Sequence, residues 1–355
     1  MKKIFAILLV LTMVLTISAA SFAADGKIGV AMPTQSLQRW NQDGANMKAQ
    51  LEEAGYTVDL QYANNNVATQ ISQIENMILG GVDVLVIASI DGSALGNVLE
   101  TAKEEGIPVI AYDRLIMETD AVSYYATFDN YMVGTIQGEY LVDALNLENR
   151  TADDPAYIEI FTGSPDDNNA RFFFGGAMDV INPYIEEGVV VVRSDQTEFE
   201  QVATMNWDPA NAQARMDNLI AAHYSAGQEL DAVLCSNDST ALGVINSLQG
   251  AGFTKDNFPV ITGQDCDITA TKNIIAGYQS MSIFKDTRTL AAQVVDMIVD
   301  IQNGEEPEIN DTETYDNGTG IIPSYLCEPV FADEDNYEEL LIDSGYYTPE
   351  QLGLE

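Results

Sequence analysis

Short apolar segments alternate with helical patterns along most of this chain, and that alternation restricts the possible folds more than any other feature of the sequence. Residues 82–88 form one such segment, and residues 107–112 form another that opens just after Gly106. Apolar runs of this length, bounded by Gly and Pro, are typical of strands buried on both faces of a parallel sheet. The sequence therefore predicts an α/β fold in which helices cover both faces of parallel sheets.

The alternation occurs twice. The order β-α-β-α-β-α-β-β occupies residues 27–128, and a second series of helices and strands runs from about residue 131 to residue 284. Two series of similar rhythm predict two similar lobes. A helix after Phe284 and an extended segment at 317–327 fit neither series, so we expect the chain to cross between the lobes more than once. Such crossings would form a hinge with a cleft between the lobes.

The first 24 residues have the pattern of a cleavable secretory signal peptide. Lys2 and Lys3 precede an apolar run from Ile4 to Ala20, and small residues flank the expected cleavage point near residue 23. The cleavage region is not followed by a Cys that could carry a lipid. We therefore expect a soluble protein of a bacterial periplasm, with a mature chain that begins near residue 25.

The composition argues against several classes of partner. The formal charge is −40, and removal of Lys2 and Lys3 with the signal would make it −42. A surface this acidic repels phosphate backbones, so we expect no nucleic-acid partner. The three Cys are far apart in the sequence and have no neighbouring His, which favours small buried side chains over disulfides or a metal site.

Motifs for catalysis are absent from the sequence. It has no Gly-Lys-Ser/Thr phosphate loop, no Gly-x-Gly-x-x-Gly after the first strand and no Gly-x-Ser-x-Gly. The single His, His223, lies inside a helical pattern, where we expect a structural role. The sequence thus predicts a protein that is not an enzyme and that needs neither a cofactor nor a metal.

Polar side chains follow the ends of many predicted strands. Because the carboxyl ends of strands in an open parallel sheet border the ligand crevice, we expect these side chains to line one cleft between the facing lobes. Arg39 and Trp40 lie in the first turns of the first predicted helix and join this set. The strand-end residues are Asp113, Arg114, Asp167, Asn169, Asn237, Asp238, Gln264, Asp265 and Lys285.

Acids, amides and cations together with aromatic rings suit a neutral ligand with many hydroxyl groups. Each hydroxyl can donate to a carboxylate and accept from Arg, Asn or Lys, while the C–H faces of a sugar pack on rings. Trp40, Trp207 and one of the three aromatic residues 172–174 are the candidate rings. An unmatched buried polar group costs ~1–3 kcal/mol, so a closed cleft would discriminate between sugars.

Each member of the set also has a structural explanation. The alternatives are helix caps for Asn169 (or its neighbour Asn168) and Asn237, packing under a loop for Trp207, core packing for residues 172–174, and solvated charges for Asp113, Arg114 and Lys285. Their joint placement at strand ends favours the binding site over these separate explanations.

Five motifs connect the chain to a known family. They are Ile-Ala-Tyr-Asp-Arg-Leu-Ile at 110–116, Gly-Ser-Pro-Asp-Asp-Asn-Asn-Ala at 163–170, Ser-Asn-Asp at 236–238, Gly-Gln-Asp at 263–265 and Phe-Lys-Asp at 284–286. In this order and spacing they resemble the periplasmic sugar-binding proteins of ABC importers, type I, in the ribose/galactose/xylose cluster. The resemblance covers residues 27–347 and is closest to the xylose-binding and multiple-sugar-binding proteins.

The resemblance implies a clam-shell of two Rossmann-like lobes joined by three crossings, near residues 127–130, 282–286 and 322–326. The N-terminal lobe would comprise residues 25–128 plus 285–320, and the C-terminal lobe residues 129–284 plus 321–355. The implied sugar-site residues are Arg39, Trp40, Asp113, Arg114, Asp167, Asn169, Phe174, Trp207, Asn237, Asp265 and Lys285. Phe174 stands where xylose binders tend to have Arg and broader-range relatives an aromatic residue, so xylose, glucose, galactose and arabinose all remain candidates.

The resemblance also implies partners. We expect the closed, sugar-bound form to deliver a monosaccharide to an ABC transporter membrane permease. One alternative is a sensor whose closed form is presented to a chemoreceptor or a histidine kinase. A second alternative is a secreted enzyme acting on sugars, which would require paired acids in the cleft, whereas the expected acids are accompanied by Arg, Asn and Lys.

Overall fold

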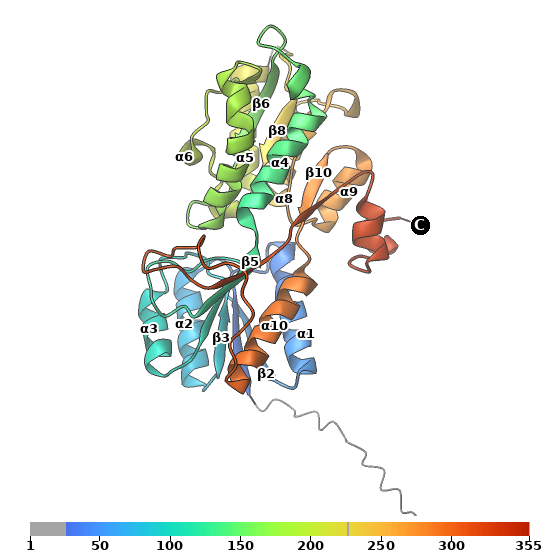
Figure 1. The fold of residues 1–355 in the computed structure, drawn as a ribbon. Helices are drawn as coiled ribbons and strands as arrows, with labels where there is room; N and C mark the ends of the chain where they lie inside the picture. Colours follow the sequence, from blue (N-terminus) through green and yellow to red (C-terminus); the bar gives the residue numbers. More distant parts are fainter. Residues whose placement is uncertain (1–25, 226, 355) are drawn as a thin grey trace, which may run out of the picture.

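The computed structural model describes residues 26–225 and 227–354, so the predicted signal peptide lies outside the described residues. Two lobes, each with its own sheet, are stacked end to end (Figure 1). This arrangement confirms the predicted α/β class with two Rossmann-like lobes. Within the described residues, every helix is too short or too polar to cross a membrane.

The first lobe contains a six-stranded sheet in which every pairing is parallel, in the order β11-β5-β4-β3-β1-β2. Its strands are β1 (Lys27–Met32), β2 (Thr57–Tyr62), β3 (Val84–Ile87), β4 (Val109–Tyr112), β5 (Tyr124–Phe128) and β11 (Ser324–Cys327). Two helices cover each face. On one face lie α1 (Gln38–Glu53) and α10 (Thr287–Asn303), and on the other α2 (Val67–Leu79) and α3 (Gly96–Glu104).

The second lobe repeats this plan around a parallel four-stranded sheet in the order β7-β6-β8-β9. Its strands are β6 (Ala156–Phe161), β7 (Val190–Val192), β8 (Ala232–Cys235) and β9 (Val260–Ile261). The pair α4 (Asn130–Ala144) and α5 (Asn169–Glu186) covers one face, and α7 (Pro209–Leu219) and α8 (Asp238–Gly250) the other. The short helix α6 (Phe199–Val202) follows β7.

An antiparallel pair extends the second lobe. Strand β10 (Met281–Phe284) pairs with β12 (Val330–Asp333), and a bridge between Gln264 and Ile283 joins it to the segment after β9. Helix α9 (Ile268–Ala276) precedes β10, and the C-terminal α11 (Pro349–Leu352) packs against α9.

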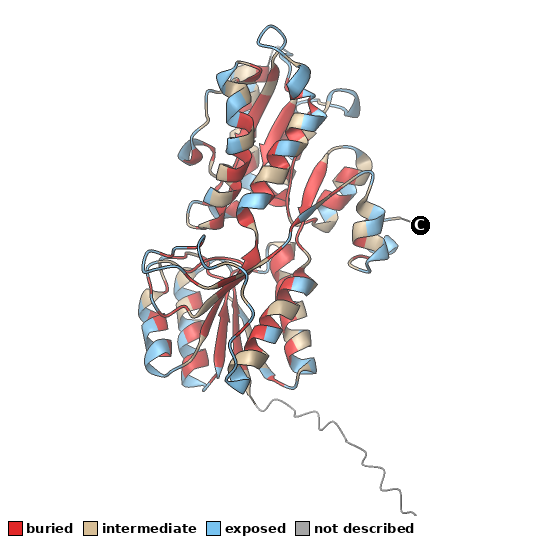
Figure 2. Ribbon diagram, viewed as in Figure 1, coloured by how far each residue is buried: buried red, intermediate tan, exposed pale blue. Residues whose placement is uncertain are grey.

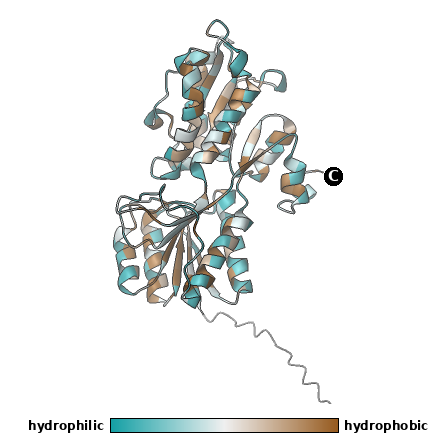
Figure 3. Cartoon of the chain, viewed as in Figure 1, coloured by the Kyte–Doolittle hydropathy of each residue, from teal (hydrophilic) through white to brown (hydrophobic). Residues whose placement is uncertain are grey.

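The apolar alternation read from the sequence corresponds to buried strands. All residues of β3, β4 and β8 are buried (Figure 2), and the strands of both sheets are hydrophobic beside more polar outer helix faces (Figure 3). Side chains at several helix starts explain where those helices begin, since Asn66, Asp129, Asn237 and Asp286 each accept a hydrogen bond from a backbone N–H in the first turn. These caps follow strand ends, so helices start close to the edge of the sheet where the site forms.

The chain crosses between the lobes three times, as expected, but the third crossing differs from the prediction. Crossings follow β5 and β10, close to the predicted positions. The segment 322–326, expected to cross, instead stays in the first lobe, where β11 (Ser324–Cys327) pairs in parallel with β5. The third crossing therefore lies between Cys327 and Val330. The boundary expected at residue 321 was wrong for this strand, because β11 is a four-residue edge strand that begins on Ser324 and contains no apolar run long enough to mark it in the sequence.

Candidate functional site

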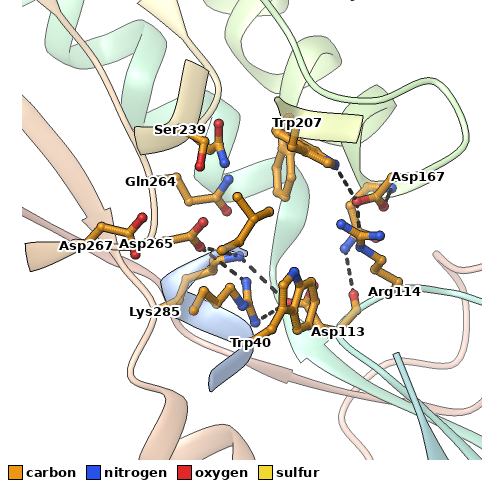
Figure 4. A pocket seen from close by; sticks show the side chains of 15 residues that line it. Trp40, Asp113, Arg114, Asp167, Trp207, Ser239, Gln264, Asp265, Asp267 and Lys285 are labelled. Carbon is orange, nitrogen blue, oxygen red and sulfur yellow. Dashed lines mark hydrogen bonds and ion pairs between the residues drawn. The ribbon is translucent and has the colours of Figure 1, made fainter. Parts of the chain in front are cut away.

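A cavity lies between the lobes, at the carboxyl ends of the strands of both sheets (Figure 4). Ten of the eleven predicted site residues line it, and Phe174 does not. Its empty space is about 410 Å³, and part of that space is open to solvent. The lining residues are Leu37, Arg39, Trp40, Asp113, Arg114, Asp167, Asn169, Phe173, Trp207, Asn237, Ser239, Gln264, Asp265, Asp267 and Lys285.

Three of the lining residues have a backbone conformation that favours glycine. Asp113 follows β4 with φ 59°, Asp265 follows β9 with φ 97°, and Trp207 has φ 56°. Non-glycine residues with positive φ are uncommon, and such strain concentrates at functional sites. The tight turns at these positions direct the side chains of strand-end residues into the gap between the lobes.

Arg39 is the centre of one ion-pair cluster. The guanidinium is buried on α1, and its Nε donates to Asp43 Oδ2 at 2.9 Å. Its Nη2 lies 2.5 Å from Asp113 Oδ1 in the first lobe, and its Nη1 donates to Asp265 Oδ1 in the second lobe at 3.3 Å. Tyr112 on β4 donates its hydroxyl to the other oxygen of Asp43 at 2.5 Å. The carboxyl group of Asp43 thus fixes the orientation of the Arg39 guanidinium. The two terminal nitrogens of that guanidinium then contact the cavity-lining residues Asp113 and Asp265.

Lys285 completes this cluster from the second crossing. The ammonium lies 3.2 Å from Asp265 Oδ1 and 3.7 Å from Asp113 Oδ1. Burial alone would raise the pKa of Asp113, but the charges of Arg39, Lys285 and Arg114 outweigh burial and hold that pKa below its usual value. Asp113 therefore stays ionised as an acceptor for hydroxyl groups.

Arg114 and Asp167 form a second ion pair across the gap. Arg114 Nε lies 2.9 Å from Asp167 Oδ2, and Arg114 Nη1 donates to the backbone oxygen of Ser89. Trp207 donates its ring N–H to the same Asp167 oxygen at 3.1 Å. Burial raises the pKa of Asp167, although Arg114 partly offsets that effect.

The position of the Trp207 ring requires a glycine at position 163. A Cβ at Gly163 would lie 2.0 Å from a ring carbon of Trp207, so any larger residue would displace the indole. Trp207 and Trp40 lie on opposite sides of the space in Figure 4, one in each lobe. The guanidinium carbons of Arg39 and Arg114 lie 4.9 and 5.0 Å from the centre of the Trp40 ring, which holds that ring in place.

The aromatic residue that lines the cavity is Phe173, so the prediction of Phe174 was wrong by one position. Phe173 packs near Trp207, with ring centres 6.1 Å apart, and lies below Lys285 Nζ at 5.7 Å. Phe174 instead packs against Phe199 of α6, away from the cavity. Neighbouring residues of a helix point about 100° apart, and three consecutive Phe in the sequence do not reveal which one faces the cleft.

The two predicted amides both line the cavity and both make structural contacts. Asn237 caps α8 through Thr240 N, so the alternative explanation for this residue also holds. Asn169 joins the lobes directly, because its Nδ2 donates to the backbone oxygen of Asp113 at 2.6 Å and its Oδ1 accepts from Tyr125 at 2.9 Å. Asn169 thus uses its amide to hold the closed arrangement.

Buried polar atoms without a partner are concentrated at this cavity. Among the described residues, nine buried side-chain nitrogen or oxygen atoms have no hydrogen-bond partner within the protein, and five belong to cavity-lining residues. These five are Arg39 Nη2, Asp113 Oδ1, Arg114 Nε, Gln264 Oε1 and Asp267 Oδ1. Arg39 Nη2, Asp113 Oδ1 and Arg114 Nε nevertheless take part in ion pairs at 2.5–2.9 Å. Among the described residues, Gln264 Oε1 and Asp267 Oδ1 are therefore the two of these five atoms without any polar partner. Because an unsatisfied buried polar group costs ~1–3 kcal/mol, the cavity favours a ligand that supplies both donors and acceptors.

Sequence reasoning left five lining residues out of the predicted site. Gln264 was among the strand-end residues, whereas Leu37, Ser239 and Asp267 lie at or just inside helix starts. Asp267 is the N-cap residue of α9, yet its side chain makes no capping hydrogen bond. Burial and the neighbouring Asp265 charge raise the pKa of Asp267 to about 7. An acidic residue just before a helix could have suggested this position, because the amino end of a helix favours an anion.

Fold and cavity together define a class: a two-lobed binding protein that encloses a small polar ligand between hinged α/β lobes. A family model described as periplasmic binding protein domain matches residues 28–306, and the chain belongs to this family.

Relatives of known role are similar over nearly their whole length. The multiple sugar-binding periplasmic receptor ChvE of Rhizobium radiobacter is 50% identical over 337 residues, covering 94% of each chain. The D-xylose-binding periplasmic protein of Escherichia coli (strain K12) is 38% identical, covering 99% of this chain and all of that one. A solved structure of an ABC transporter solute-binding protein from Clostridium phytofermentans with bound β-D-glucose is 65% identical with a TM-score of 0.89, covering 92% of this chain and 99% of that one.

Proposed function

We propose that this chain is an extracytoplasmic solute-binding protein that encloses one aldopyranose monosaccharide between its lobes and delivers it to the permease of an ABC sugar importer. The observation that carries this proposal is the set of charged and polar side chains from both lobes that converge on one cavity between two indole rings. A pyranose presents hydroxyl groups around its rim and C–H groups on its faces, which matches polar atoms at the cavity wall and rings above and below.

Ligand specificity follows from the same wall. Arg39, Arg114 and Lys285 supply donors, and Asp113, Asp265 and Gln264 supply acceptors. The names of the relatives support this class of ligand, since they include a multiple sugar-binding receptor, a xylose-binding protein and a structure with glucose. Glucose, xylose, galactose and arabinose are therefore the candidate sugars.

Hinge closure provides the mechanism of delivery. The sugar contacts both lobes at once, so it stabilises the closed state through contacts that the open state cannot make. The membrane permease would then recognise the closed form. The relative described as a receptor supports a second candidate, in which the closed form is presented to a sensory protein. The same cleft would serve either partner.

Isothermal titration of the mature protein against a panel of pentoses and hexoses tests the proposal. We expect saturable binding of one sugar per chain for at least one of glucose, xylose, galactose and arabinose, and no binding of an acyclic polyol of the same size. No heat with any sugar of the panel, from a folded protein, would reject the assignment. Purification of a sugar-dependent complex with an ABC permease, or with a sensory membrane protein instead, would separate the transport and sensory roles.

A further inference from the structure

A second cavity adjoins the first at the mouth of the cleft. It shares Leu37, Ser239 and Asp267 with the inner cavity, and residues of both lobes line it. We refer to it as the outer cavity. Its water-accessible volume is about 430 Å³, compared with about 30 Å³ for the inner cavity. The closed structure therefore keeps a roomy space directly beside the tight one.

Ten of the fourteen residues that line the outer cavity are polar. Asn65 and Ser36 come from the first lobe, whereas Asn206, Thr269 and Asn273 come from the second. In the described part of the chain, the side chains of Asn65, Asn206, Ser239, Thr269 and Asn273 make no hydrogen bond or ion pair with other residues. Leu37, Leu242, Pro209 and Ala270 add apolar surface. Amides and hydroxyls interspersed with apolar carbon are the chemistry that suits a sugar ring.

The charge of the outer cavity distinguishes it from the inner one. Three cations line the inner cavity, but the described residues that line the outer cavity include neither Lys nor Arg. They do include three acidic residues, Asp208, Asp238 and Asp267. An anionic group at this position would lack a partner and face acids, so the ligand portion that lies here is neutral.

Asp267 connects the two spaces. It lines both cavities, and its buried Oδ1 has no hydrogen-bond partner within the described residues. The backbone N–H of Asp267 donates a hydrogen bond to Asp238 Oδ2 at 2.8 Å, and this bond fixes the position of Asp267 at the start of α9. A carboxyl oxygen at the junction can accept a hydrogen bond from a hydroxyl of either of two linked rings.

We propose that the outer cavity is a second sugar subsite, which accepts the second ring of a neutral disaccharide or glycoside whose first ring occupies the inner cavity. This inference rests on the proposed monosaccharide site. A ring in the inner cavity whose substituted oxygen points toward Asp267 can carry its substituent into the outer cavity without opening the hinge further. The contacts of Arg39, Asp113 and Lys285 with the first ring would be unchanged.

Titration with monosaccharides and disaccharides tests this inference. The panel contains the monosaccharide that binds most tightly and neutral disaccharides of that sugar that differ in linkage position and anomer. It also contains a disaccharide of the same size in which one ring is a uronic acid. We expect at least one neutral disaccharide to bind within about tenfold of the monosaccharide, and the acidic one to bind at least tenfold more weakly than its neutral counterpart. Native mass spectrometry of the complex verifies that the bound ligand is the intact disaccharide.

A variant that fills the outer cavity locates the subsite. Thr269 is exposed on α9, and Thr269→Trp should weaken disaccharide binding at least tenfold while monosaccharide binding changes less than twofold. Thr101→Trp, at an exposed position of α3 outside both cavities, is the matched control and should leave both affinities unchanged.

The outcomes separate the two proposals. Monosaccharide binding without binding of any disaccharide would overturn the second subsite and leave the proposed function intact. Disaccharide binding that is unaffected by Thr269→Trp would overturn the location of the subsite. Failure of every sugar to bind would overturn both the subsite and the proposed function.

Discussion

The two walls of the inner cavity carry opposite charge. Arg39 and Arg114 come from the first lobe and Lys285 from the crossing after β10, whereas the second-lobe residues that line the cavity include acids and amides but neither Lys nor Arg. Two ion pairs consequently span the gap, Arg39 with Asp265 and Arg114 with Asp167. Opening the hinge separates these charges.

This difference teaches how a neutral ligand can drive closure. Opposite charges at 4 Å attract by about 4 kcal/mol at an effective dielectric constant of 20, but each group loses hydration when it is buried. The net contribution of the pairs to closure is therefore small. A sugar changes the balance, because its hydroxyls can hydrogen-bond to polar groups of both walls at once. The following predictions test the two walls separately.

The largest effect is expected from the first-lobe carboxylate. Asp113→Ala removes the acceptor shared by Arg39 and Lys285 and leaves both cations partly unpaired in a buried site. Truncation of one partner of a buried pair costs about 2–5 kcal/mol, so we expect sugar binding at least about 30-fold weaker by isothermal titration. A thermal melt of the free variant is the control for folding. A dissociation constant within threefold of the parent would show that Asp113 does not contact the ligand.

The pair that spans the gap should show energetic coupling. Arg114→Gln and Asp167→Asn each remove one member, and Arg114 lies in the first lobe while Asp167 lies in the second. We expect each single variant to weaken sugar binding by about 2 kcal/mol, with a coupling energy of about 1–2 kcal/mol in the double-mutant cycle. Additive losses would indicate that the two walls act independently, which would contradict coupling through this ion pair.

The second-lobe acids should make stability depend on pH. Burial and Asp265 raise the pKa of Asp267 from 3.8 to about 7, while the charge of Arg39 partly opposes the shift. Since the folded protein binds the proton more tightly than the unfolded chain, the free energy of unfolding should fall as the pH rises from about 4 to about 7. Asp267→Asn should remove about 1–2 kcal/mol of that dependence in denaturant titrations of the ligand-free protein. An unchanged slope would contradict the assignment.

The smallest effect distinguishes two adjacent aromatic residues. Phe173→Leu removes ring contact with Trp207 at the cavity wall, and we expect sugar binding about fivefold weaker, or about 1 kcal/mol. Phe174→Leu is the matched control and should leave the affinity within twofold, because Phe174 packs against Phe199 instead. Equal losses for both variants would mean that the effect arises from helix packing rather than from the ligand.

Much of this architecture could be predicted from the sequence because strand ends are visible in it. The apolar run before Asp113 ends abruptly on charge, and a parallel topology then requires such ends to meet at one edge. Ten of the eleven candidate residues were placed at the cavity by that reasoning and by the family resemblance.

The rest could not be predicted, for two physical reasons. The rotation of α5 about its axis determines whether Phe173 or Phe174 faces the cavity. That rotation could be inferred only from the exact first residue of the helix, which a sequence pattern does not give. Strand β11 contains no apolar run that would identify it in the sequence. It lies at the edge of its sheet, and its position is determined by pairing with β5.

The bond from Asn169 to Asp113 has a consequence for how such a cleft can change over time. Its acceptor is the main-chain oxygen, which is present whatever amino acid occupies position 113. This hydrogen bond between the lobes therefore does not depend on the side chain at position 113, which faces the ligand. Evolution or a designer can alter which sugar is recognised at that position while the two halves continue to meet in the same way.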